Sequence, residues 1–303
     1  MTSERRILGL MLAPYLLGLA VLVAVPAVAT FGLALTDYDL IRSPDVVGLD
    51  NFRELVDDRV FRIALVNSLV FAAVAVPLRL VAALGLALLL HRNGRGMGLA
   101  RSAVVLPTIV PELAYGLLWL WLLNPLYGPL NGLLTAGGEN GATAFGRQPP
   151  QWLTDPNDAR IAMVLLSVFL VGEGFVLLLV ARRAVPADLY ELAALEDATW
   201  WDVFRRITLP LMLPVVVLLG LRDVVLSLQL NLIPALVVTE GGPPDFATTY
   251  LGLFVYRNGF EYLRYGYAAA ATVVLVLMTA AIVLIQLWLL RRWQRRSLLG
   301  QRR

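Results

Sequence analysis

The chain has 303 residues, of which 59% are hydrophobic and 16% are charged, and its formal net charge is +3. A soluble globular domain is about 45–50% apolar and about 25% charged, so this composition argues against a water-soluble enzyme built around one core. It also excludes a disordered chain, because disordered segments lack apolar residues. Cysteine is absent, which rules out disulfides, thiolate metal sites and cysteine nucleophiles.

Six apolar segments are long enough to cross a bilayer, since each helical crossing needs roughly 20 apolar residues. Only a helix satisfies its own backbone hydrogen bonds in lipid, and the short alternating strands of a membrane barrel are not seen. We therefore predict an all-α, polytopic membrane protein in which residues 1–303 form a single transmembrane domain. Its six transmembrane helices are expected at about residues 7–35, 63–90, 102–123, 161–181, 210–235 and 267–290.

The first apolar segment is about twice as long as the apolar region of a signal peptide, and no small-residue cleavage site closes it, so we expect a retained helix. Arginines are concentrated near the N-terminus, in the loops after the second and fourth predicted helices, and near the C-terminus. The positive-inside rule places these parts, with both termini, in the cytoplasm. The chain is therefore expected in the cytoplasmic (inner) membrane.

The loops predicted on the outer side are too long to serve only as connections, which indicates that they make contacts of their own. In the first of them, Gly48-Leu49-Asp50-Asn51-Phe52 is typical of a turn followed by an amphipathic helix on the membrane. The same loop is rich in acidic residues, so the outer side carries a negative electrostatic field with which a partner protein could interact. These residues are Asp37, Asp39, Asp45, Asp50, Glu54, Asp57 and Asp58.

The loop between the fourth and fifth predicted helices, residues 183–209, has the pattern of a cytoplasmic helical hairpin. Pro186 favours a helix start, and apolar residues from Leu189 onward recur with helical spacing. Asp197 or Thr199 is suited to cap a second, shorter helix that carries two tryptophans. The pattern fits both an amphipathic segment resting on lipid and a docking surface for a soluble partner.

This loop resembles the cytoplasmic EAA loop of the permease subunits of binding-protein-dependent ABC importers. That motif reads roughly E-A-A, three residues, G, nine residues and I-x-L-P, and it aligns with Glu191-Leu192-Ala193 and Ile207-Thr208-Leu209-Pro210. Leu192 replaces an alanine of the motif, and Asp197 replaces its glycine. Aspartate tolerates the left-handed conformation that glycine allows better than most residues do, so the hairpin is still expected.

Three further stretches are similar to the sugar-import branch of these permeases, which includes the maltose, trehalose and glycerol-3-phosphate permeases. Each stretch is a weak signal alone, and their order and spacing together carry the resemblance. The stretches are Asn124-Pro125-x-Tyr127-Gly128-x-Leu130-Asn131, Thr239-Glu240-Gly241-Gly242-Pro243, and Tyr256 through Gly266-Tyr267-Ala268-Ala269-Ala270.

The resemblance implies a non-catalytic transmembrane subunit of an ATP-driven importer, forming half of the path for a carbohydrate or related polyol. Its expected partners are a second permease subunit, two cytoplasmic ATPase subunits, an extracytoplasmic solute-binding protein and the lipid bilayer, with no nucleic acid. The chain has no Walker A sequence, so no cofactor is expected here, and ATP and magnesium would be held by the ATPase. The residues implied to couple the hairpin to that ATPase are Tyr190, Glu191, Ala193, Ala194, Asp197, Ala198, Trp201, Phe204, Leu209 and Pro210.

Charged side chains inside a membrane cost roughly 2.5–3.5 kcal/mol each on insertion scales, so they are expected to face the bundle interior or a watery path. Asp223, Ser227 and Asn231 are spaced by four residues and share one helix face. Short polar groups of this kind suit hydroxyl-rich solutes. The residues predicted to line the solute path are Glu173, Asp223, Ser227, Asn231, Glu112 and Tyr115.

For each charged residue among them the alternative is a structural ion pair, with Arg79 or Arg222 as the cation. No metal site is expected. The alternative function is an ion-gradient-driven secondary transporter of a small polar solute, although no inverted repeat is evident. An intramembrane enzyme is disfavoured because His91 is the one histidine, and a passive pore would not need the acidic loop or the hairpin. The sequence leaves the solute and the identity of the second permease open.

Overall fold

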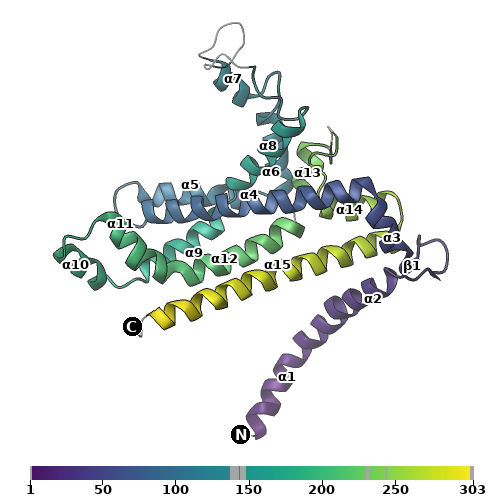
Figure 1. Cartoon of the computed structure of the whole chain (residues 1–303), viewed down its shortest axis with the longest axis horizontal. Helices are drawn as coiled ribbons and strands as arrows, with labels where there is room; N and C mark the ends of the chain where they lie inside the picture. The colour runs from purple at the N-terminus through teal and green to yellow at the C-terminus, as the bar shows by residue number, and fades with distance from the viewer. Residues whose placement is uncertain (1, 137–142, 144–147, 230–231, 243–244, 301–303) are drawn as a thin grey trace. The chain divides into compact units, whose positions relative to one another are not determined.

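A computed structural model shows that the chain is predominantly helical (Figure 1). Among the described residues, the strands are β1 (Thr36–Asp37) and β2 (Asp45–Val46), which form a small antiparallel ribbon. This architecture confirms the predicted helical class. The structure describes residues 2–136, 143, 148–229, 232–242 and 245–300.

Two compact units divide the chain, and each draws on separate stretches of sequence. The first unit comprises Met1–Arg62 and Phe254–Met278, and the second comprises Ile63–Leu253 and Thr279–Arg303. Four helical segments of the described chain are long and apolar enough to cross a membrane, and two bent helix pairs raise the number to six if each pair is one crossing. The four are Ile7–Leu33, Arg59–Leu89, Trp200–Gln229 and Tyr265–Arg292.

In the first unit, α1 (Thr2–Leu19), the π-helical turn η1 (Ala20–Ala24) and α2 (Val25–Leu33) form one continuous apolar segment. Most of its large side chains are exposed, including Leu10 at 74% and Leu22 at 76%. A contiguous apolar surface of this size suits contact with lipid or protein rather than with water. The unit also contains α3 (Asp50–Asp57), η3 (Arg257–Glu261) and the first turns of α15 (Tyr265–Gly300).

The third predicted crossing, residues 102–123, is not one helix. It falls on α5 (Met97–Ile109) and α6 (Glu112–Leu122), which meet at an angle of 101°. Proline explains the break, because Pro111 has no N–H to donate and forces Val110 before it into an extended conformation, with ψ at 132°.

The fourth predicted crossing, residues 161–181, is also bent, by 45°, between α8 (Pro156–Val168) and α9 (Gly172–Arg183). The start of α9 lies very close to α5. A Cβ atom at Gly172 would come within 2.8 Å of the Thr108 hydroxyl and 2.9 Å of the Val105 Cα, so glycine is required for this approach.

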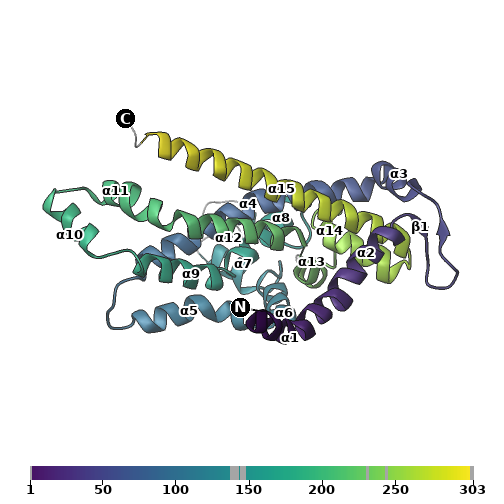
Figure 2. The same cartoon turned by 90° about the horizontal axis from the view of Figure 1, so that it is seen from below.

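The core of the second unit lies where most of α4 (Arg59–Leu89) meets α9 and α12 (Leu209–Gln229). Figures 1 and 2 show α9 between α5 and α12, and it packs against both. Phe175 and Met212 are fully buried in this core. The remaining helices of this unit are α7 (Pro129–Thr135), α10 (Asp188–Leu195), α11 (Trp200–Val203) with the π-turn η2 (Phe204–Thr208), α13 (Leu232–Val238) and, at its end, α14 (Leu251–Tyr256).

Candidate functional site

The second unit contains the predicted hairpin, formed by α10 and α11, which projects beyond the ends of α9 and α12 (Figures 1 and 2). Helix α10 ends in a reciprocal pair of backbone hydrogen bonds. The N–H of Ala198 donates to the carbonyl of Ala193 at 3.0 Å, and the N–H of Asp197 donates to the carbonyl of Ala194 at 3.3 Å. This is the Schellman arrangement, which needs a left-handed residue directly after the helix cap.

Asp197 occupies that left-handed position, with φ at +52°. The structure therefore confirms the turn conformation that we expected of this aspartate, and it explains why the motif has glycine there. Thr199 begins α11, because its hydroxyl accepts a hydrogen bond from the N–H of Asp202 at 3.2 Å. Of the two predicted caps, Thr199 is the one used.

Tyr190, in α10, connects the hairpin to α9 and to the turn that precedes α12. Its hydroxyl shares a hydrogen bond with Thr208 at 3.1 Å, and its ring lies 4.2 Å below the guanidinium of Arg182. His91, just beyond α4, donates from Nδ1 to the carbonyl of Leu88 at 2.6 Å and accepts from Arg182 at 3.5 Å through Nε2. Partial burial lowers the pKa of His91, and the nearby arginines lower it further, so the neutral imidazole is favoured.

The outer surface of the hairpin is apolar and aromatic. Leu195 and Trp200 are 83% and 72% exposed, and Trp201 is also exposed. The rings of Trp200 and Phe204 stack at 5.6 Å, while Trp201 lies 5.5 Å from Phe204. Ala193 is buried, and the motif ends where Leu209 and Pro210 open α12.

A cavity of about 450 Å³ lies in the same unit and collects most of the polar residues predicted for a solute path. Helices α4, α5, α6, α8, α9 and α12 all contribute to its walls. Five of the six predicted residues line it, from three separate helices: Glu112, Tyr115, Glu173, Asp223 and Ser227. The sixth, Asn231, lies outside the described residues.

Two ion pairs dominate the polar part of this cavity. Arg79 donates from Nε to Asp223 Oδ2 at 3.0 Å and also bonds the hydroxyl of Ser227. These side chains of Arg79 and Asp223 are only 15% and 21% exposed. Arg222 donates to Glu173 Oε2 at 2.6 Å, and this second pair is about half exposed. Asp223 and Glu173 thus have the arginine partners that the sequence offered as an alternative.

The remaining predicted residues occupy different environments. Tyr115 is 3% exposed and donates its hydroxyl hydrogen to the carbonyl of Leu166 at 2.8 Å, so it is fixed in the wall. Glu112 lies in the first turn of α6, directly after the proline break. Thr108 and Ser167 also line the cavity, and the sequence contains no signal that distinguishes them from ordinary helical residues.

The stretch from Asn124 to Asn131, selected from the sequence for its resemblance, builds a loop in the second unit. Asn124 Oδ1 accepts from the N–H groups of Leu126 and Tyr127 at 3.0 and 3.2 Å, which closes a turn. Asn131 is 5% exposed, and its Oδ1 accepts from the Trp152 indole at 2.8 Å. These asparagines therefore hold the loop together.

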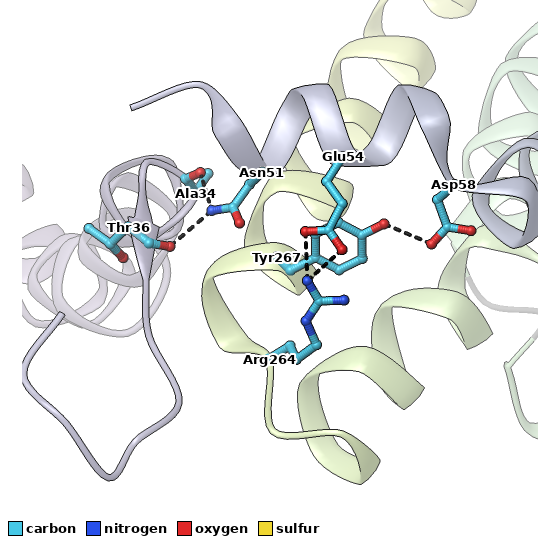
Figure 3. A network of polar contacts seen from close by, with 7 residues as sticks. All are labelled: Ala34, Thr36, Asn51, Glu54, Asp58, Arg264 and Tyr267. Atoms are coloured by element: carbon cyan, nitrogen blue, oxygen red, sulfur yellow. Dashed lines mark hydrogen bonds and ion pairs between the residues drawn. The ribbon is translucent and has the colours of Figure 1, made fainter. Parts of the chain in front are cut away.

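The first unit contains a polar network around α3 (Figure 3). The amide of Asn51 donates to the carbonyls of Ala34 and Thr36 at 3.0 and 2.9 Å, which ties α3 to the end of α2. Arg264 reaches both carboxylate oxygens of Glu54 at 2.7 Å. The predicted amphipathic helix after residue 49 is thus present as α3 and is firmly anchored.

The same network reaches the start of α15. Tyr267 donates to Asp58 Oδ2 at 2.8 Å, and its ring packs 4.2 Å from the Arg264 guanidinium. The other oxygen of Asp58 accepts from the N–H groups of Val60 and Phe61, which caps α4. A side chain at Gly266 would overlap the carbonyl oxygen of β1, so this stretch also requires glycine.

Comparisons with known proteins agree on one class. A family model described as "Binding-protein-dependent transport system inner membrane component" matches residues 79–295. The trehalose/maltose transport system permease protein MalF of Thermococcus litoralis is 30% identical over 94% of this chain and 93% of its own length. The sn-glycerol-3-phosphate transport system permease protein UgpA of Yersinia enterocolitica is 30% identical over 80% of each chain.

A solved structure shares the fold. A chain of a bacterial ABC transporter involved in the import of the acidic polysaccharide alginate superposes with a TM-score of 0.81, at 23% identity, over 96% of both chains.

Proposed function

Because the chain belongs to the family of binding-protein-dependent transport system inner membrane components, we propose that it forms half of the translocation path of an ATP-driven importer for a carbohydrate or related polyol. Its relatives are permease subunits of ABC importers, and two of them are named for trehalose/maltose and for glycerol-3-phosphate. The observation that carries the proposal is the cavity of the second unit. It gathers five predicted polar residues from three helices.

The cavity suits a solute that carries many hydroxyl groups. Carboxylate oxygens accept hydrogen bonds from hydroxyls, and guanidinium N–H groups donate to them. Apolar side chains such as Phe71, Leu226 and Met163 complete the walls, as is usual where a small ligand binds. A partner permease would supply the opposite wall of the path.

The hairpin is proposed to receive the motion of an ATPase subunit. Its exposed tryptophans and leucines offer an apolar surface, and aromatic side chains are effective anchors in protein interfaces. Tyr190 and the start of α12 join this surface to the transmembrane body, so a movement of the hairpin reaches α12 directly. Such coupling would produce alternating access by rigid-body rearrangement.

The proposed assembly contains a second permease, two ATPase subunits and an extracytoplasmic binding protein, in the cytoplasmic membrane. ATP and magnesium would be bound by the ATPase subunits. Both termini and the hairpin would lie in the cytoplasm, in agreement with the arginine distribution. The anchored α3 would then lie on the outer side with the acidic first loop.

The proposal is tested by uptake into vesicles that contain the complete assembly with its binding protein. Uptake should stop when ATP is depleted and should survive collapse of the ion gradients. The opposite result would support the alternative of an ion-gradient-driven transporter, which the acids in the membrane favour. Asp223→Ala and Asn231→Ala variants then test the path, since normal uptake with normal specificity would remove both residues from it.

A further inference from the structure

The charged residues that line the cavity are not balanced. Two are arginines, Arg79 and Arg222, and three are acids, Glu112, Glu173 and Asp223. Each arginine already holds a carboxylate of this chain, at 3.0 Å for Arg79 and 2.6 Å for Arg222. An anionic solute would therefore have to displace a carboxylate before it could use either guanidinium.

The two ion pairs meet on one turn of α12. Arg222 and Asp223 are neighbours in the sequence, so each supplies one member of a pair whose partner comes from another helix, Glu173 from α9 and Arg79 from α4. Opposite charges therefore alternate across the wall of the cavity, and their fields largely cancel there. Glu112, in the first turn of α6 directly after the proline break, adds a further carboxylate to the lining.

We infer that this cavity selects uncharged, hydroxyl-rich solutes and rejects anionic ones, with the Arg222–Glu173 pair as the specificity-determining contact. The inference rests on the proposed transport function and narrows its solute class, since that class includes both neutral sugars and phosphorylated polyols. Hydroxyl groups can bridge an ion pair without breaking it, because they donate to the carboxylate and accept from the guanidinium. Among the described residues that line the cavity, both arginines are already paired with carboxylates, so the carboxylate of an anionic solute would meet no unpaired guanidinium there.

The more exposed pair is the one that can be altered without removing a buried contact. Glu173 and Arg222 are 59% and 45% exposed, whereas Arg79 and Asp223 are largely buried. Glu173→Gln removes the acid and leaves Arg222 available to an anion. Arg222→Gln does the opposite and leaves Glu173 uncompensated. Asp57→Asn, in α3 and outside the cavity, changes the net charge of the chain as Glu173→Gln does and serves as its control.

The experiment is equilibrium dialysis of the permease–ATPase assembly without its binding protein, using radiolabelled sugars in neutral and acidic pairs. The pairs are glucose with glucuronate and maltose with maltobionate. The unaltered assembly should bind at least one neutral sugar about tenfold more tightly than its acidic analogue, a difference of about 1.4 kcal/mol. Glu173→Gln should reduce that preference several-fold, Arg222→Gln should increase it, and Asp57→Asn should leave it unchanged.

Several outcomes would overturn the inference. They are equal binding of an acidic analogue and its neutral partner, no binding of either neutral sugar, and a preference that Glu173→Gln does not change. ATP-dependent uptake by the same assembly with its binding protein is measured in parallel. If uptake persists while the preference is absent, the charge selection is refuted and the importer function stands; if uptake itself is absent, the proposed function fails.

Discussion

The Arg79–Asp223 pair allows a quantitative test of how charges are accommodated in this chain. Asp223→Ala removes the carboxylate that Arg79 meets at 3.0 Å, in surroundings where the two side chains are 15% and 21% exposed. Breaking a fully buried pair by removing one partner costs about 3–5 kcal/mol, because a buried charge is left uncompensated. Because the Arg79–Asp223 pair is still partly exposed, we expect Asp223→Ala to destabilise the protein by the lower end of that range, about 3 kcal/mol.

The double variant Arg79→Leu with Asp223→Leu separates this explanation from a simple loss of packing. Replacing both charges by apolar residues is often neutral for a buried pair, so the double variant should lose about 1 kcal/mol or less. Arg53→Ala is the control, since Arg53 and Asp50 form an ion pair whose side chains are 77% and 65% exposed. Surface pairs of this kind contribute about 0–1 kcal/mol.

The assay is the apparent unfolding midpoint of the purified assembly at a fixed heating rate, since unfolding of such assemblies is often irreversible. At roughly 2–4 °C per kcal/mol, Asp223→Ala should lower the midpoint by roughly 6–12 °C and the double variant by clearly less. The reasoning would be refuted if the double variant were as unstable as the single one, or if Asp223→Ala behaved like Arg53→Ala.

Four further predictions concern the hairpin and the first unit. Asp197→Gly should keep the left-handed turn and capture the ATPase at least as well as the unaltered chain, whereas Asp197→Val should weaken capture several-fold, because a β-branched residue strains that turn. Glu191→Ala with Trp201→Ala should reduce ATPase co-purification while the permease still inserts. Asn51→Leu leaves two backbone carbonyls without their donor and should lower the unfolding midpoint, at about 1–3 kcal/mol for each unpaired group. Lowering the pH from 7.5 to 5.5 should reduce the protection of the α10 amides against hydrogen exchange, measured relative to their intrinsic exchange rates at each pH, because the pKa of His91 is lowered in the folded state.

The sign of the His91 effect follows from linkage. A histidine with a lowered folded pKa contributes stability above its unfolded pKa of about 6.5, and this contribution is lost as the pH falls. His91→Gln should remove the difference in protection between the two pH values, and an unchanged difference in that variant would contradict the assignment. Full ATPase recovery with Asp197→Val, or with the Glu191→Ala and Trp201→Ala double variant, would count against docking at the hairpin. An unaltered unfolding midpoint in Asn51→Leu would count against the role of Asn51 in anchoring α3.

Much of the helical layout was predictable because it depends on local chemistry. Apolar runs of sufficient length must be helical in a membrane, and this holds for the long helices α4, α12 and α15. The hairpin was also predictable, since Thr199 and Asp197 are local signals for a cap and for a left-handed turn. The breaks were not predicted, although Pro111 and Gly172 mark their positions in the sequence.

The sequence by itself determined that the chain is a helical membrane protein and which polar residues must face away from the lipid, because both follow from composition and helical spacing. Tertiary structure alone decided which charges meet. Arg79 and Asp223 are 144 residues apart, and neither spacing nor propensity selects that pair over Arg79 with Glu112. The choice depends on how α4, α9 and α12 pack side by side, since a charge in a poorly hydrated interior is stabilised only by the partner that packing brings within hydrogen-bonding distance.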